Sequence, residues 1–320
     1  MRLTLATFNL RNLALPNFPV YADLMYNEEE YEEKINWTAQ QLQRMNADII
    51  SFQECFHGNA LLEAIRRSNC YEDFHFVMPF DNEDLPRVAL LSRYPITEHQ
   101  GIQELPSNCT LPDITNFRRP IIQSKIQITS KQDITFFAVH LKSRQPLFWE
   151  HENKEDPHNY LQALARSLHL RSTEAIAIQH LVHQCIEKEG STPIFIAGDL
   201  NDTSQAVTTQ LLCGSFPPYN SEYAIQQKFW KRRLHCLADE VSKKSFFVDN
   251  YTHIFSGHYE CLDHILASEH IHSKNPNATG KLIYLRYFTD HLIDNSQKGI
   301  YLPKHASDHG QVVATIELFI

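Results

Sequence analysis

A short apolar run that ends in polar side chains is the stretch of this sequence best suited to chemistry. Residues 194–199 read Ile-Phe-Ile-Ala-Gly-Asp, and Leu200 and Asn201 follow directly. A continuous apolar run of this length is typical of a strand buried on both faces. Because side chains alternate along a strand, we expect Asp199 and Asn201 to point the same way. Together they could position a water for attack on phosphorus, although an ordinary Asx turn would contain the same residues.

Similar polar side chains recur at or near the ends of other expected strands, distributed over the whole chain. They are Asn9, Glu54, His140, Asp263, Asp308 and His309. Each alone has an ordinary structural explanation, such as a turn residue, a helix-terminal charge, a buried histidine or a cap. Strand ends at one edge of a sheet converge, however, so a shared site explains the whole set better.

The elements that must position these residues mix strands with amphipathic helices. Apolar runs and alternation predict strands at 2–10, 49–54, 73–79, 87–93, 121–129, 134–141, 194–199, 260–267, 281–288 and 310–319. Helical spacing predicts helices at 28–45, 59–68, 161–189 and 204–212. We expect loops at 14–27, 94–117 and 143–160, and another with Pro217-Pro218. Hairpins mixed with helical crossovers indicate two mixed sheets packed together, with helices outside.

Length and composition are those of a globular protein. The chain has 320 residues, of which 42% are hydrophobic, and contains no repeat or linker, so we expect one domain over residues 1–320. No apolar run approaches the roughly 18 residues of a membrane span. A first strand that begins at residue 2 leaves no room for a signal peptide. The seven scattered cysteines have neither zinc spacing nor a disulfide pattern, so we expect a reducing, cytoplasmic location, with export by a route that needs no signal peptide as the alternative.

The net charge of −9 argues against a broad basic surface that grips nucleic acid nonspecifically. It does not exclude a nuclease, because a metal site and a few local arginines can bind phosphate.

Six motifs, taken in order, resemble the endonuclease/exonuclease/phosphatase superfamily, which has the deoxyribonuclease I-like fold. They are Ala6-Thr-Phe-Asn-Leu10, Asp48-Ile-Ile-Ser-Phe-Gln-Glu54, Ala138-Val-His-Leu-Lys142, Ala197-Gly-Asp-Leu-Asn-Asp202, Leu262-Asp-His-Ile-Leu266 and Ser307-Asp-His309. The resemblance implies an α/β (α+β) fold, a four-layer α/β/β/α sandwich with two central mixed, largely antiparallel sheets. It also implies a phosphoesterase that depends on a divalent metal, Mg²⁺ or Mn²⁺.

The resemblance also assigns roles around the metal and the attacking water. Glu54 is similar to the principal metal ligand, helped by Asn9, and Asp308 is similar to an additional acid at the metal site. Asp199 would orient or deprotonate the attacking water, and Asn201 would hold a phosphate oxygen. Magnesium prefers oxygen ligands and keeps several waters, so one or two carboxylates suffice.

The remaining roles concern the charge of the phosphate. By the same resemblance, His140 and His309 would contact the phosphate, and Asp263 would fix the tautomer or charge of His309. Arg118 would add a phosphate contact, although Arg119 is an equal candidate from the sequence alone.

Two departures set this chain apart from the branch that cleaves DNA at abasic sites. Val139-His140 stands where that branch has a tyrosine-containing stretch, and Leu10-Arg11 stands where it has an acid. The His140 pattern is more similar to the deoxyribonuclease, sphingomyelinase and inositol-phosphatase branches.

Three functions stay open: a nuclease-like phosphodiesterase, a phosphomonoesterase or lipid/inositol-phosphate hydrolase, and an inactive interaction module. The two reactions place the same charge on the same oxygens, so these motifs do not separate them. We place substrate choice in the loops at 11–33, 94–118, 143–160 and 213–235. The last loop contains Phe229-Trp-Lys-Arg-Arg233, which suits either stacking on a base or an amphipathic helix face. We expect a monomer that binds a phosphate ester, with nucleic acid among the candidates.

Overall fold

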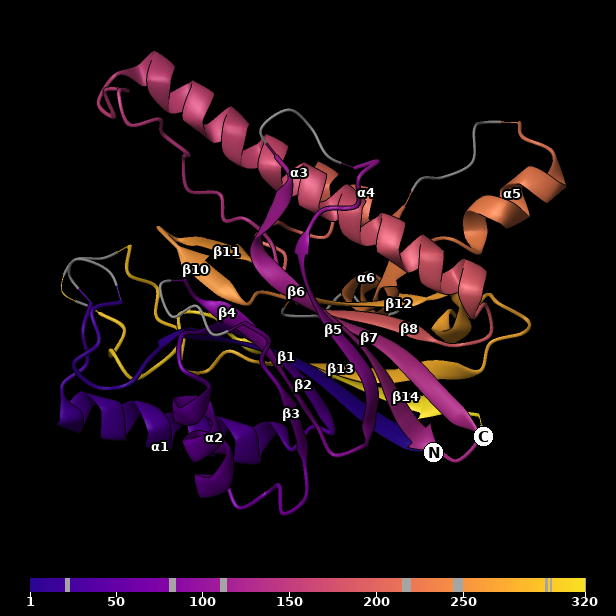
Figure 1. The fold of residues 1–320 in the computed structure, drawn as a ribbon, viewed down its shortest axis with the longest axis horizontal. Helices are drawn as coiled ribbons and strands as arrows, with labels where there is room; N and C mark the ends of the chain where they lie inside the picture. The colour runs from indigo at the N-terminus through magenta and orange to yellow at the C-terminus, as the bar shows by residue number, and fades with distance from the viewer. Residues whose placement is uncertain are drawn as a thin grey trace.

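Two six-stranded β-sheets lie face to face at the centre of the computed structural model, and helices cover their outer faces (Figure 1). The structure describes residues 1–20, 24–80, 85–109, 114–214, 220–243, 250–296, 299 and 301–319. Helices α1 (Glu28–Met45) and α2 (Gly58–Arg67) lie on one side, and α3 (Pro157–Lys188) and α4 (Val207–Cys213) on the other. The expected four-layer α/β/β/α sandwich is therefore confirmed.

The first sheet joins the two ends of the chain in the strand order β13-β14-β1-β2-β4-β3. Its strands are β1 (Arg2–Leu13), β2 (Ile49–Cys55), β3 (His75–Val77), β4 (Arg87–Ser92), β13 (Gly280–Phe288) and β14 (Gln311–Leu318). Only β1 and β2 run parallel, and the other neighbours are antiparallel among the described strands. The sheet is thus mixed but largely antiparallel, as expected.

The second sheet has the strand order β5-β6-β7-β8-β12-β9. Its strands are β5 (Ile96–Glu104), β6 (Asn116–Thr129), β7 (Gln132–His140), β8 (Ile194–Asp199), β9 (Leu234–Cys236) and β12 (Asp263–Ser268). Here β7 and β8 form the parallel pair, because α3 crosses over between them, and the remaining pairs are antiparallel.

The remaining described elements are short. They are α5 (Tyr223–Trp230), α6 (Leu237–Ser242), the 3₁₀ helix η1 (Glu269–Ile271), and the two-stranded ribbon of β10 (His253–Phe255) and β11 (His258–Glu260). None of the helices in the described part of the chain is both long and apolar enough to cross a membrane.

Alternation along the strands builds separate cores on the two faces of the second sheet. Phe136 and Phe195 belong to the core between the sheets, whereas Phe137 and Ile196 belong to the core beneath α3. All four side chains are buried, so β7 and β8 are apolar on both faces. The strand ends are therefore held rigidly from both sides.

Several sequence predictions need correction. Residues 96–104, expected as part of a loop, form the edge strand β5, which is mostly exposed and held by its pairing with β6. The long helix begins at Pro157 instead of residue 161, because Asp156 caps its N-terminus by accepting the backbone N–H groups of His158 and Asn159. The loop with Pro217-Pro218 lies outside the described residues.

Candidate active site

Asp199, at the end of β8, is the centre of the polar edge. Its side chain is 1% exposed, and its Oδ2 accepts a hydrogen bond from Asn9 Nδ2 at 3.1 Å. His140 Nε2 lies 3.4 Å from the same oxygen, and the backbone N–H of Asn201 donates to Oδ1 at 2.8 Å. Four strands contribute, because Asn9 lies on β1, which contacts β8, and β8 pairs with both β7 and β12.

Strand register places the partners of Asp199 on either side of it. His140 is opposite Asp199 in the parallel β7–β8 pair, and Asp263 is opposite Asp199 in the antiparallel β8–β12 pair. Close approach of β7 requires a glycine before Asp199, because a Cβ at Gly198 would overlap the carbonyl oxygen of Val139.

His309 and Asp263 form a buried hydrogen-bonded pair beside Asp199. His309 Nδ1 donates to Asp263 Oδ2 at 2.8 Å, and His309 Nε2 lies 3.9 Å from Asp199 Oδ2. Burial opposes the charge, yet the carboxylates of Asp263 and Asp199 hold the pKa of His309 well above its ordinary value. The ring is therefore an imidazolium between two carboxylates near neutral pH.

The charges on both histidines determine the state of Asp199. Burial alone would raise the pKa of Asp199, but the His309 charge and the hydrogen bond from His140 hold it below its ordinary value. The carboxylate is thus ionised near neutral pH.

His140 differs from His309 although both face Asp199. Burial and the nearby charge of Arg119 lower the pKa of His140 to about 4, so the ring is neutral near pH 7. Its Nδ1 is buried and has no hydrogen-bond partner among the described residues. The charged His309 could counter the charge of a phosphate, whereas the neutral His140 is suited to orienting Asp199.

Glu54, Asp308 and Asn9 fit a divalent metal by the chemistry of their oxygen atoms. Burial and the neighbouring carboxylate of Asp308 raise the pKa of Glu54, because both disfavour its charged form. The backbone N–H of Asn12 donates to Glu54 Oε2 at 3.1 Å. An oxygen set with two acids suits a divalent cation such as Mg²⁺ or Mn²⁺.

A strained turn after Asn9 supports these acids. Arg11 and Asn12 have positive φ angles of 49° and 57°, and Glu54 has a φ of 58°. The Arg11 guanidinium donates to the carbonyls of Pro303 and Ala306, both at 3.0 Å, and so ties this turn to the segment that precedes Asp308. Backbone strain concentrated here fits a functional edge.

A buried lysine, which the sequence analysis did not single out, anchors the same turn. Lys34 is 0% exposed, and its Nζ donates to the carbonyl of Arg11 at 3.1 Å. Burial and the Arg11 charge lower the pKa of Lys34 to about 7. Lys34 lies beside Ile35 on the apolar face of the 28–45 helix, and this position in the sequence could have indicated a buried lysine.

The two arginine candidates separate in the structure. Arg118 has an exposed side chain, and its backbone N–H donates to Glu174 Oε1 at 2.7 Å. Arg119 is half-buried, its Nη1 donates to the carbonyl of Leu141 at 3.1 Å, and its charge lowers the pKa of both Glu54 and His140. Of the two, Arg119 lies closer to the polar edge.

Asn201 and one unpredicted residue, Glu174, complete the edge. Asn201, with a φ of 55°, lies beyond the end of β8, and its Nδ2 donates to the Leu141 carbonyl at 3.0 Å. Glu174, buried on α3, accepts the backbone N–H of Lys142 at 2.7 Å as well as that of Arg118. In the sequence, Glu174 is an acidic residue on the apolar face of the predicted 161–189 helix, and this position could have indicated its burial.

The Phe229–Arg233 stretch lies apart from these residues. Its Trp230 ring packs on the rings of His235 and His272, with centroids 5.1 and 4.8 Å away. The packing of Trp230 therefore favours an amphipathic helix face for this stretch over stacking on a base.

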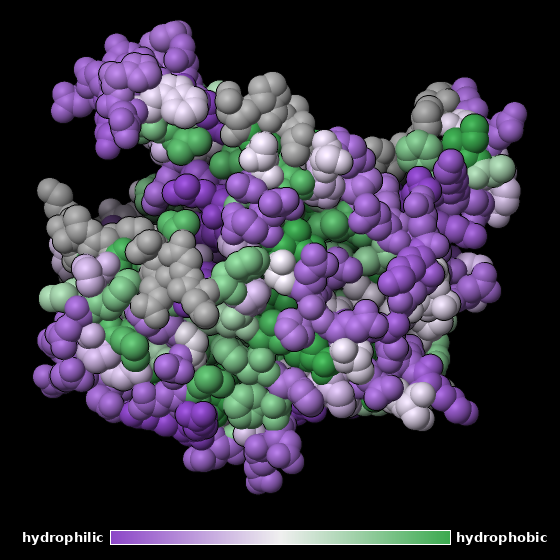
Figure 2. Space-filling view, viewed as in Figure 1, coloured by the Kyte–Doolittle hydropathy of each residue, from purple (hydrophilic) through white to green (hydrophobic). Residues whose placement is uncertain are grey.

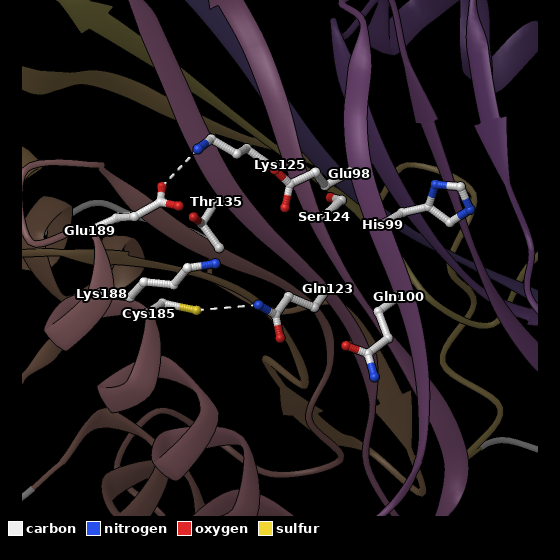
Figure 3. A pocket seen from close by; sticks show the side chains of 10 residues that line it. All are labelled: Glu98, His99, Gln100, Gln123, Ser124, Lys125, Thr135, Cys185, Lys188 and Glu189. Carbon is white, nitrogen blue, oxygen red and sulfur yellow. Dashed lines mark hydrogen bonds and ion pairs between the residues drawn. The ribbon is translucent and has the colours of Figure 1, made fainter.

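A separate hollow of about 190 Å³ lies between β5–β7 and the C-terminal part of α3 (Figure 3). In it Lys125 donates to Glu189 at 2.9 Å and Gln123 donates to the Cys185 sulfur at 3.3 Å. Thr135, near the start of β7, is among its described lining residues, whereas His140 ends that strand. The hollow thus lies toward the opposite end of the sheet from the polar edge.

The architecture and the polar edge together define a class of protein: a four-layer α/β sandwich in which acids and histidines converge where strands of both sheets end. The sequence profile described as Endonuclease/Exonuclease/phosphatase family matches residues 6–309. The chain belongs to this family, whose members are phosphoester hydrolases that typically use a divalent metal.

Solved structures share the fold over nearly the whole chain. Truncated TDP2 from Caenorhabditis elegans aligns with a TM-score of 0.60 at 14% identity, covering 99% of this chain and 98% of that one. The human Nocturnin catalytic domain with bound sulfate gives 0.58 at 13%, covering 99% and 94%. A mannosyl-6-phosphatase from Bacteroides thetaiotaomicron gives 0.56 at 16%, covering 98% and 99%. At these identities the likeness shows the fold alone, and no curated protein sequence matches the chain.

Proposed function

We propose that this protein hydrolyses a phosphodiester bond by in-line attack of a water, with Mg²⁺ or Mn²⁺ bound at the acidic edge. The observation that supports this most is the state of Asp199, an ionised and buried carboxylate held by Asn9, His140 and the backbone of Asn201. A fixed carboxylate of this kind can orient a water and accept its proton. An inactive module has no need of such an arrangement.

The positive charges of His309 and Arg119 would stabilise the phosphoryl oxygens of the substrate. The His309 imidazolium, held by Asp263, can donate from Nε2 toward a phosphoryl oxygen. We assign Arg119 the phosphate contact first expected of Arg118, since its charge reaches Glu54 and His140. Fixed donors and charges aimed at the reacting group do not have to reorganise during the reaction.

Glu54, Asn9 and Asp308 are the proposed metal ligands. When bound, the cation would act as a Lewis acid toward a phosphoryl oxygen and offset its negative charge. The amide of Asn9 is already oriented, because its Oδ1 accepts the Arg11 N–H at 2.9 Å and its Nδ2 donates to Asp199. Asn201 retains an amide N–H for a phosphate oxygen, since one N–H is used on Leu141.

A cavity of about 560 Å³ next to Arg118 supports a diester over a monoester. It lies between the start of β6 and the N-terminal half of α3, and Trp149 and Arg166 are among its lining residues. The N-terminal end of α3 and the preceding loop overhang the body of the molecule, with a hollow beneath them that both hydrophilic and hydrophobic side chains border (Figure 2). This space would accommodate the group that a diester carries beyond its phosphate.

Three further expectations are proposals of the same kind. We propose one domain over residues 1–320, a monomer, and a cytoplasmic location. The last is supported by the cysteines, all seven of which are free.

A substrate panel tests the proposal. Bis(p-nitrophenyl) phosphate, p-nitrophenyl phosphate, single-stranded DNA, RNA and sphingomyelin would be offered with Mg²⁺, Mn²⁺ or EDTA. We expect metal-dependent hydrolysis with diesters preferred, and a loss of about 10²-fold or more in Asp199→Asn. The exposed Asp73→Asn variant should keep full activity as the matched control. Preference for the monoester would contradict the diester assignment, and absence of metal-dependent hydrolysis would contradict the proposed function.

A further inference from the structure

Two histidines and a glutamate meet at a corner of the second sheet, away from the acidic edge. They are His235 on β9, Glu240 on α6, and His272 directly after η1. One ligand atom from each lies within 4.8 Å of the others, and His272 Nε2 is 3.3 Å from Glu240 Oε1. Pairing of His235 with Ala267 brings β9 beside β12, which leads directly into η1.

The histidine rings are packed in place before any ligand arrives. The His235 and His272 ring centroids are 4.1 Å apart, and Trp230 of α5 packs on both rings. Glu240 and His272 are 8% and 6% exposed. Such packing fixes the orientation of the ligand atoms, which a metal site requires.

One nitrogen of this cluster has no partner. His235 Nε2 is buried and makes no hydrogen bond with any described residue. A buried polar atom without a partner requires an explanation, and an ion is one of those known.

Space for a further ligand lies next to the same atoms. A cavity of about 110 Å³ is lined by His235, Glu240 and His272, together with Lys281 and residues of β12. This volume can hold a water as a fourth ligand.

An ion-pair network is the rival explanation of the cluster. Lys243 Nζ donates to Glu240 Oε1 at 2.7 Å, and His272 Nδ1 accepts the Lys274 N–H at 3.1 Å, which leaves the His272 proton on Nε2 toward Glu240. A metal at His272 Nε2 requires this proton to move to Nδ1, which ends the contact from the Lys274 N–H. It must also displace the Lys243 ammonium, whose side chain is 65% exposed and can turn to water. The network accounts for Glu240 and His272 but leaves His235 Nε2 without a role.

We propose that His235, Glu240 and His272 bind Zn²⁺, with a water in the cavity as the fourth ligand. Two imidazoles with one carboxylate suit zinc rather than magnesium, which prefers oxygen alone. Zinc–nitrogen and zinc–oxygen distances of about 2.0–2.1 Å place tetrahedral ligand atoms about 3.3–3.4 Å apart. The His272–Glu240 separation already has this value. The ion would tie β9, α6 and the η1 turn together.

Zinc binding should be measured in the Glu54→Gln background, so that the acidic edge contributes little. After EDTA treatment and its removal, calorimetry should give one Zn²⁺ per chain that excess Mg²⁺ does not displace, and Tm should rise by about 3 °C or more. Adding His235→Gln or Glu240→Gln should weaken zinc binding at least 10-fold, whereas the exposed His258→Gln should leave it unchanged. Equal zinc affinity in all three variants would overturn the proposal.

A second measurement does not depend on how the variants fold. Zinc X-ray absorption of the Glu54→Gln protein should show two imidazole nitrogens and oxygen ligands, and an all-oxygen shell would also overturn the site. This proposal does not rest on the hydrolase function, so either can fail without the other.

Discussion

At the scale of single residues, the polar edge is a row of neighbouring groups in which each influences the protonation state or orientation of the next. Asp263 holds the proton on His309, His309 keeps Asp199 ionised, and the neutral His140 donates to Asp199. Proton acceptor and proton donor are thus both available near neutral pH, which general acid–base chemistry requires.

The pH profile should report the His309–Asp263 pair. The pKa of His309 is raised, so its charge is fully present below its ordinary pKa and is lost as pH rises through the raised value. Asp263→Asn removes one of the carboxylates that raise it, so the alkaline limb of kcat/KM should move to lower pH. The rate should fall about 10²-fold.

The measurement is kcat/KM against pH for wild type, Asp263→Asn and the control Asp73→Asn, each checked for folding by circular dichroism. If Asp263 only supports the fold, the variant loses thermal stability while its alkaline limb stays in place. A well-folded variant with an unmoved limb would show that the proposed pair does not control the reaction.

Glu54 provides the corresponding prediction for the metal. Glu54→Ala should abolish turnover at millimolar Mg²⁺, because the remaining candidates are Asn9 and Asp308. The fold should change little: alanine and glutamate share the same Cβ strain at a φ of 58°, and the lost acceptor for Asn12 is worth about 1 kcal/mol. Rates against Mg²⁺ concentration and a metal-free thermal melt test this. Wild-type activity in the variant would exclude Glu54 as the principal ligand.

At the scale of elements, the parallel β7–β8 pair is what joins His140 to Asp199. Their register is set by side chains packed on both faces and by the close backbone contact at Gly198. This contact has a consequence for stability as well as for the site.

Gly198→Ala should destabilise the protein by about 1–3 kcal/mol, the usual cost of overpacking, because the added methyl group overlaps the Val139 carbonyl. Urea unfolding measures this. Gly58→Ala is the matched control, since its Cβ would meet the flexible Met78 sulfur at 3.3 Å at the start of α2. Equal midpoints for the two variants would contradict the close β7–β8 approach.

Sequence patterns predict the elements that are buried and fail for those that are not. The apolar run predicted at 194–199 is strand β8 with the same bounds, and the 28–45 helix matches α1. Strand β5 was missed because pairing with β6, rather than its own exposed residues, holds it in the sheet. The same reason applies within the site: Lys34 and Glu174 act through contacts with residues distant in the chain, which local spacing does not reveal.

At the scale of the whole molecule, the two sheets bring together strand ends from the beginning, middle and end of the chain. Residues of β1 and β8 meet there with the segment that precedes β14. Asn9 contacts Asp199, and Ser307 donates to the Asn9 carbonyl at 2.7 Å while accepting the His309 N–H at 3.0 Å. We expect substrate choice, by contrast, to depend on the loops around this edge.

Trp149 is the residue of those surroundings best placed to bind a planar group. Its side chain is 50% exposed in the cavity next to Arg118. Glu152 accepts the Trp149 backbone N–H at 2.8 Å and pairs with Arg166 at 2.5 Å. The Arg166 guanidinium in turn lies 5.0 Å from the centroid of the Trp149 ring. The ring is therefore already oriented, so stacking on it would cost little side-chain entropy.

Trp149→Ala should then lower kcat/KM for a dinucleotide about 10-fold or more, because stacking of a base on an aromatic ring is worth about 1–3 kcal/mol. Hydrolysis of methyl p-nitrophenyl phosphate, which has no nucleobase, should fall far less. Tyr223→Ala, an exposed aromatic residue on α5, is the matched control and should affect neither substrate. Equal losses for both substrates would mean that Trp149 supports the 143–157 loop instead of binding a base.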